Sequence, residues 1–107
     1  MNTIIVTEGA WSLRTLYLSA NTPSKRALVG YMLKTRRADD MVYGGALYLL
    51  RDIETCKGIY YLKPECEMHK AKQIIHITEM ALAGQYNRFA LSKREIRKIL
   101  KHMKKGR

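Results

Sequence analysis

Between Pro64 and Gly84 the hydrophobic positions recur every three or four residues, which places them on one face of a helix. The positions on this face are Met68, Ala71, Ile74, Ile75, Thr78, Ala81 and Leu82. Gly84 suits the residue that follows a helix C-terminus, because glycine adopts the left-handed backbone without strain. The pattern predicts a core helix that ends shortly before Gly84.

A second periodic segment follows Thr22 and Pro23, which fit an N-cap and the first helical position. Its apolar face comprises Ala27, Leu28, Tyr31, Met32 and Thr35. Its end is basic, with Lys34, Arg36 and Arg37, and cations are favoured beside the carbonyl groups that end a helix. We therefore expect a helix whose last turn carries positive charge.

Three further segments are less regular. Residues 3–7 are β-branched and short, which suits an edge strand or an ordered arm, and residues 10–19 fit a helix better than a strand. Residues 41–55 read as a helix behind Asp39 and Asp40, but Gly44-Gly45 could instead be a hairpin turn, with a further strand at 59–62. The sequence leaves these two alternatives open.

The C-terminal segment has the clearest helix start. Ser92-Lys93-Arg94-Glu95 has the form of a capping box, in which the serine and glutamate side chains each accept from the other residue's backbone N–H. A helix is predicted from about residue 92 to 105, with an apolar arc about 100° wide that packs on the rest of the domain. That arc comprises Ile96, Ile99, Leu100 and Met103.

These elements predict a mostly α fold. We expect a single small domain over residues 1–107, with four to five helices and a short N-terminal strand or small β-hairpin. An α+β fold is the alternative, because residues 41–62 fit either a helix or a hairpin.

Positive charge is concentrated at the C-terminus. The formal net charge is +11, and residues 88–107 hold nine basic residues and one acidic residue. On a helical wheel seven of these cations share an arc about 140° wide, which extends over roughly 18 Å along the helix. The seven are Lys93, Arg94, Arg97, Lys98, Lys101, Lys104 and Lys105.

A one-sided basic arc on a capped, anchored helix is typical of a surface that grips a phosphate backbone. We therefore predict a nucleic-acid-binding regulatory or accessory protein, with DNA and RNA both possible partners and with Lys34, Arg36, Arg37 and Arg88 as secondary basic residues. The alternative is an inhibitor or adaptor that docks the helix on an acidic protein. A merely solvated basic face is the simplest competing explanation.

Seven tyrosines are many for a chain of this length. Tyr60 and Tyr61, beside Lys57 and Lys63, are the most suggestive pair for stacking on unpaired bases. Tyrosines in a small domain more often belong to its core, and adjacent residues of a strand point to opposite faces. We therefore expect at most one of the two to be buried.

Catalytic and metal-binding patterns are weak. Cys56, Cys66, His69 and His76 could supply zinc ligands, but their spacing matches no common zinc site. The close acidic pairs, Asp39-Asp40 and Glu65/Glu67, occur where predicted helices begin, which explains them without Mg²⁺. We predict no enzyme activity, no metal and no cofactor.

The sequence has no signal peptide pattern and no apolar segment near the roughly 18 residues that a membrane span needs. We expect a cytoplasmic protein without a membrane partner.

Overall fold

The computed structural model describes residues 3–6, 13–37, 53, 58–64 and 67–105, without the side chains of Leu13, Lys104 and Lys105. The elements in chain order are β1 (Thr3–Val6), α1 (Leu13–Ser19), α2 (Pro23–Lys34), β2 (Ile59–Leu62), α5 (Met68–Leu82), the 3-10 helix η1 (Asn87–Phe89) and α6 (Lys93–Lys105). The described part of the chain is mostly helical with one small sheet, and the predicted mostly α fold is confirmed. Among the described residues, no helix is long and apolar enough to cross a bilayer.

The sheet joins the N-terminal strand to the middle of the chain. β1 and β2 pair in parallel, with Thr3 opposite Ile59 and Val6 opposite Leu62. Tyr60 is buried and Tyr61 is half-buried, so at most one of this pair is buried, as expected. The segment at 41–55, for which a helix and a hairpin were both considered, lies outside the described residues.

Helix α2 begins and ends as its sequence indicates. Thr22 Oγ1 accepts a hydrogen bond from the Lys25 backbone N–H at 3.4 Å, and Pro23 is the first helical residue. The expectation that Thr35 belongs to the apolar face is wrong, since α2 ends at Lys34. Thr35 is exposed, and its hydroxyl donates to the Tyr31 carbonyl at 2.9 Å.

Helix α5 has the predicted position, and Gly84 has the positive φ expected after it. Ile77 is buried as well as the predicted face, so α5 contributes more of its circumference to the core than the pattern indicated. Met68 and Leu82, predicted to be core residues, are 57% and 42% exposed because they occupy the two ends of the helix.

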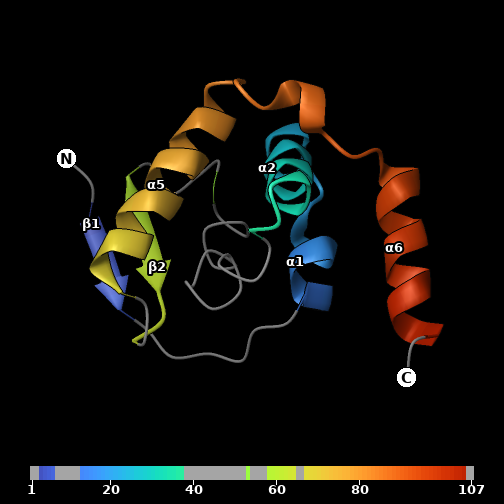
Figure 1. The fold of residues 1–107 in the computed structure, drawn as a ribbon, viewed down its shortest axis with the longest axis horizontal. Helices are drawn as coiled ribbons and strands as arrows, with labels where there is room; N and C mark the ends of the chain where they lie inside the picture. Colours follow the sequence, from blue (N-terminus) through green and yellow to red (C-terminus); the bar gives the residue numbers. More distant parts are fainter. Residues whose placement is uncertain (1–2, 7–12, 38–52, 54–57, 65–66, 106–107) are drawn as a thin grey trace.

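The core joins all the longer elements. Its buried side chains are Leu16, Tyr17 and Ala20 of α1, Leu28, Val29 and Met32 of α2, Ile53, Tyr60 of β2, Ile74, Ile75, Ile77 and Ala81 of α5, and Ile96 of α6. Figure 1 shows α5 and the sheet at one end of the view, α6 at the other, and α1 and α2 between them. Thr78 is also buried, and within the described part of the chain its hydroxyl has no hydrogen-bond partner.

A glycine allows α2 and η1 to meet. A Cβ atom at Gly30 would lie 1.7 Å from the Phe89 carbonyl oxygen and 2.8 Å from its carbonyl carbon. The Leu91 N–H also donates to the Arg26 carbonyl, at 3.4 Å. The backbone of η1 therefore lies directly on α2, which fixes where the chain turns toward α6.

Candidate nucleic-acid interface

The predicted capping box forms at the start of α6. The Ser92 N–H donates to Glu95 Oε1 and the Glu95 N–H donates to Ser92 Oγ, both at 3.0 Å. The hydrogen bonds from the Ser92 backbone and side chain lower the pKa of Glu95, and the nearby Lys98 charge lowers it further. The start of α6 is thus determined by residues within its own first turn.

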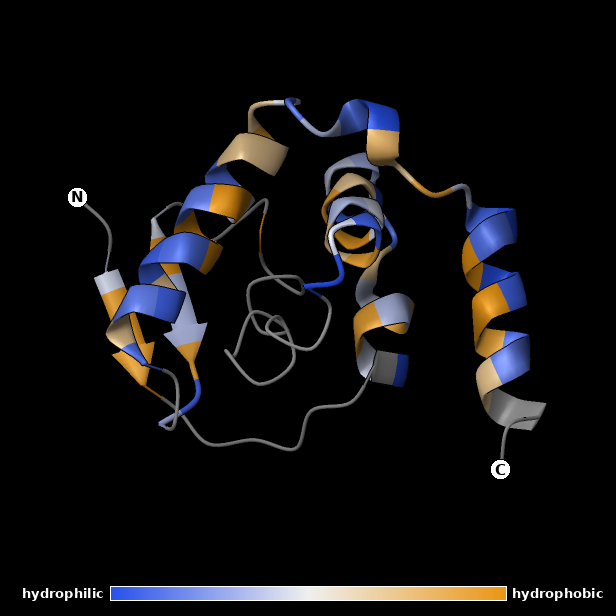
Figure 2. Ribbon diagram, in the orientation of Figure 1, coloured by the Kyte–Doolittle hydropathy of each residue, from blue (hydrophilic) through white to orange (hydrophobic). Residues whose placement is uncertain are grey.

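The apolar side of α6 packs on the protein as predicted. Ile96 is buried, and Ile99, Leu100 and Met103 are half-buried against the core. Among the described elements, α1 is the one that α6 contacts most extensively. Figure 2 shows the hydrophobic side of α6 turned toward α1 and α2 and its hydrophilic side turned away.

The opposite side of α6 carries exposed cations. We call the exposed side chains of Lys93, Arg94, Arg97, Lys98 and Lys101 the α6 basic face. Lys104 and Lys105 also belong to α6, but their side chains are outside the described part of the structure. Within the described part of the chain His69 forms an ion pair with Glu67, and none of the five cations of the α6 basic face forms one with a carboxylate.

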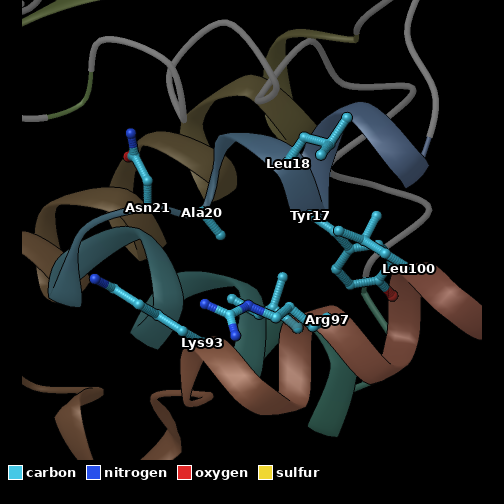
Figure 3. A pocket seen from close by; sticks show the side chains of 8 residues that line it. Tyr17, Leu18, Ala20, Asn21, Lys93, Arg97 and Leu100 are labelled. Carbon is cyan, nitrogen blue, oxygen red and sulfur yellow. The ribbon is translucent and has the colours of Figure 1, made fainter.

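One edge of the α6 basic face borders a pocket between α1 and α6. The pocket has a volume of about 230 Å³ and is lined by Tyr17, Leu18, Ala20, Asn21, Lys93, Ile96, Arg97 and Leu100. Figure 3 shows Lys93 and Arg97 extending from α6 into the space beside α1. Leu18 is 59% exposed at this site. We call it the α1–α6 pocket, and it combines an apolar lining with two cations.

The structure brings three of the four secondary basic residues to a second site. Tyr31 of α2 stacks on Tyr86 with ring centroids 3.8 Å apart, and the Phe89 ring meets Tyr31 edge-on at 5.4 Å. Lys34 Nζ lies 5.3 Å from the centre of the Phe89 ring, and Arg88 Cζ lies 4.8 Å from it. We call the rings of Tyr31, Tyr86 and Phe89 the aromatic patch.

Arg37 is the third secondary cation near this patch, and its charge lowers the pKa of Tyr86. Burial raises the pKa of Tyr86, as do a side-chain hydrogen bond with Tyr31 and the Tyr31 charge, whereas Arg37 lowers it. Arg36 is exposed and no contact between it and the patch is recorded among the described residues. Its φ of 59° places it in the turn after α2.

The candidate metal ligands do not assemble among the residues that the structure describes. His69 and His76 are exposed, and His69 Nε2 pairs with Glu67 Oε2 at 3.3 Å. No group of three His, Cys, Asp or Glu side chains converges within the described ranges. Cys56, Cys66, Asp39-Asp40 and Glu65 lie outside them.

Comparisons of this chain with protein-family models, with curated proteins and with solved structures find no match.

The aromatic patch and the α1–α6 pocket were not anticipated from the sequence. The patch contains Phe89, which no sequence pattern singles out, and two of seven tyrosines. Tyr31 and Lys34 are three residues apart on one helix, which is a local signal for a shared face. Their proximity to Tyr86, Arg88 and Phe89 depends on the packing of η1 against α2.

Proposed function

We propose that this chain is a nucleic-acid-binding protein of regulatory or accessory function, which holds the phosphate backbone with the α6 basic face. The observation that carries the proposal is the orientation of α6: its apolar side is packed on α1, and its five described cations are all exposed on the remaining surface of the helix. Arg94, Lys98 and Lys101 do not line the α1–α6 pocket, and they form the centre of the proposed contact.

The electrostatics of α6 also support this proposal. Like charges at i and i+4, such as Arg94 with Lys98 and Arg97 with Lys101, each destabilise a helix by about 0.2–0.5 kcal/mol. A helix selected only for solubility usually intersperses acidic residues on such a face. Neutralisation by phosphates relieves this repulsion and releases the counterions condensed on the nucleic acid.

We propose a regulatory or accessory role because the sequence offers few carboxylates that could hold catalytic metal ions. Hydrolysis of nucleic acid usually requires two or three carboxylates that hold metal ions. The sequence has nine acidic residues, and its close pairs occur at expected helix starts. We therefore propose binding without catalysis.

Fluorescence anisotropy against labelled duplex DNA, single-stranded DNA and duplex RNA tests the proposal. Removing Lys98 and Lys101 together as Lys98→Gln/Lys101→Gln is expected to weaken binding and to reduce the log–log salt slope on duplex DNA by about 2. The matched control is Lys70→Gln/Lys72→Gln on α5, which removes the same two charges elsewhere. Equal effects of the two pairs, or no binding at low salt, would contradict the proposal.

The α1–α6 pocket favours a second candidate function, the docking of an acidic partner protein. Exposed Leu18 and half-buried Leu100 offer apolar contacts beside Lys93 and Arg97. An acidic amphipathic peptide helix serves as the probe. Under this alternative the affinity for the peptide depends little on salt, and Leu18→Gln abolishes peptide binding. Under the leading proposal Leu18→Gln leaves nucleic-acid affinity unchanged.

A further inference from the structure

We propose that the aromatic patch stacks an unpaired base of a single-stranded nucleic acid whose phosphates continue onto the α6 basic face. This inference rests on the proposed function and names its substrate class: single strands in preference to duplexes. Aromatic side chains bind single strands because every base has a π-face that can stack on a ring.

The residues of the patch are partly exposed. Tyr31, Tyr86 and Phe89 are each only partly buried, in contrast to Tyr17 and Tyr60, whose exposed fractions are 6% and 5%. The Tyr31 and Tyr86 rings are nearly parallel, with planes 13° apart, and Phe89 meets them at 72° and 63°. Ring planes in two orientations thus lie within one small area, which suits a flat ligand that stacks on one ring and meets another edge-on.

Charge at the patch suits phosphate next to the base. Lys34 and Arg88 lie over the Phe89 ring, and the charge of Arg37 lowers the pKa of Tyr86. No ion pair joins these three cations to a carboxylate among the residues that the structure describes. A guanidinium group can stack on a base as well as contact a phosphate, so Arg88 suits both parts of a nucleotide.

The patch is held in place before any ligand arrives. The close contact of Gly30 with the Phe89 backbone fixes η1 on α2, and the Tyr31–Tyr86 stack holds the two tyrosine rings together. Rings held in this way lose little conformational entropy when a base stacks on them. Such preorganisation favours binding by stacking.

The patch and the α6 basic face are close along the chain. Phe89 and Lys93 are separated by four residue steps, and four extended residues span at most about 14 Å. Figure 1 shows η1 leading through a short connection into α6. A single strand whose base stacks at Phe89 therefore reaches the first cations of α6 within a few nucleotides.

The test uses a single-stranded oligonucleotide carrying 2-aminopurine, in DNA and RNA forms, and a duplex of the same sequence. Phe89→Leu removes the ring and keeps an apolar side chain, and it is expected to lower single-strand affinity about 5- to 100-fold with little effect on the duplex. Tyr61→Leu on β2 is the comparison, because Tyr61 is a half-buried tyrosine outside the patch and the other stacking candidate, and an equal or larger loss there would overturn the inference. Quenching of 2-aminopurine fluorescence on wild-type binding reports the stacking directly.

A second variant tests the inference in case Phe89→Leu unfolds the protein locally. Arg88 is exposed, so Arg88→Gln should keep the fold and still weaken single-strand binding more than duplex binding. Circular dichroism verifies the fold of each variant. Wild-type affinity in both folded variants, or equal loss for single strand and duplex, would overturn the inference.

The two proposals fail in different ways. If Lys98→Gln/Lys101→Gln weakens binding while the Phe89 and Arg88 variants do not, the proposed function stands and the stacking site is wrong. If the aromatic variants lose single-strand binding and the lysine variant does not, the α6 assignment is wrong. If the wild-type chain binds none of the oligonucleotides at low salt, both are wrong.

Discussion

The α6 basic face and the aromatic patch are both cationic, but they are built differently. The five cations of the α6 basic face come from one helix, and its start depends on the adjacent Ser92 and Glu95. The patch takes Tyr31 and Lys34 from α2, and Tyr86, Arg88 and Phe89 from the segment at η1. The difference indicates that the cations of the first surface are brought together by helix formation within one segment, and those of the second by the packing of η1 on α2.

Gly30→Ala is expected to have the largest effect, and to fall on the patch. The new Cβ would overlap the Phe89 carbonyl group, so η1 must move off α2. We expect a loss of about 3 kcal/mol in the free energy of unfolding, although alanine favours helices over glycine by about 1 kcal/mol. Denaturant unfolding measures the loss, and near-ultraviolet circular dichroism follows the tyrosine stack. Unchanged stability would show that η1 is not held by this contact.

Ile96→Ala is the corresponding change for α6. Ile96 is 6% exposed and is the most buried of the described side chains of α6, so truncation is expected to cost about 2 kcal/mol. Ile99→Ala serves as the comparison and should cost less, because Ile99 is only half-buried. Hydrogen exchange should show increased opening of α6 with the Tyr31–Tyr86 stack retained. Equal losses of protection in α2 and α6 would remove the distinction between the two surfaces.

Thr78→Val is expected to stabilise the core that both surfaces share. The buried Thr78 hydroxyl has no hydrogen-bond partner within the described residues, and valine has nearly the same shape. Removing an unsatisfied buried hydroxyl is expected to raise the free energy of unfolding by roughly 1 kcal/mol. Thr78→Ser, which keeps the hydroxyl and loses the methyl group, should be less stable than wild type. Thermal unfolding measures both, and a less stable valine variant would indicate a partner for the hydroxyl.

The smallest expected effect is the pH dependence of the α6 capping box. The Glu95 pKa is lower in the folded protein than in the unfolded chain, so folding favours the ionised carboxylate. The stabilisation that ionised Glu95 gives to the folded protein is fully present above its unfolded-state pKa. It is lost as the pH falls through the lower folded-state pKa. Exchange protection of α6 should therefore decrease in acid more than that of α2. Glu95→Gln should reduce this pH dependence, and an unchanged profile would contradict the assignment.

Local signals predicted most of the secondary structure. Pro23 with Thr22, Gly84, and the pair Ser92 and Glu95 determine helix ends through bonds within a few residues, and the structure has those ends. The burial of individual side chains was less predictable. Met68 has the spacing of a core residue and is exposed, because periodicity does not show where the neighbouring elements stop.

The sequence predicted the α6 basic face, whose residues are close together in the chain, but not the aromatic patch, whose residues come from distant segments. The exposure of the five described α6 cations follows from helical spacing and the anchoring of Ile96. Lys34 and Arg88 meet at Phe89 because Gly30 has no side chain and the backbone of η1 can lie on α2. The importance of this glycine becomes visible only once α2 and η1 are packed together. Sequence spacing cannot show such a contact between residues more than fifty positions apart.

The parallel pairing of β1 with β2 also determines the order in which the chain can assemble. Thr3 pairs with Ile59, so the sheet closes a loop that contains α1 and α2, and closing long loops slows folding. Contacts such as those of α5 with its following turn, and of Ser92 with Glu95, involve near neighbours and form without that delay. We expect the C-terminal helices to form early and the N-terminal strand to join last. The slowest folding step would then be found at the opposite end of the chain from its most highly charged helix.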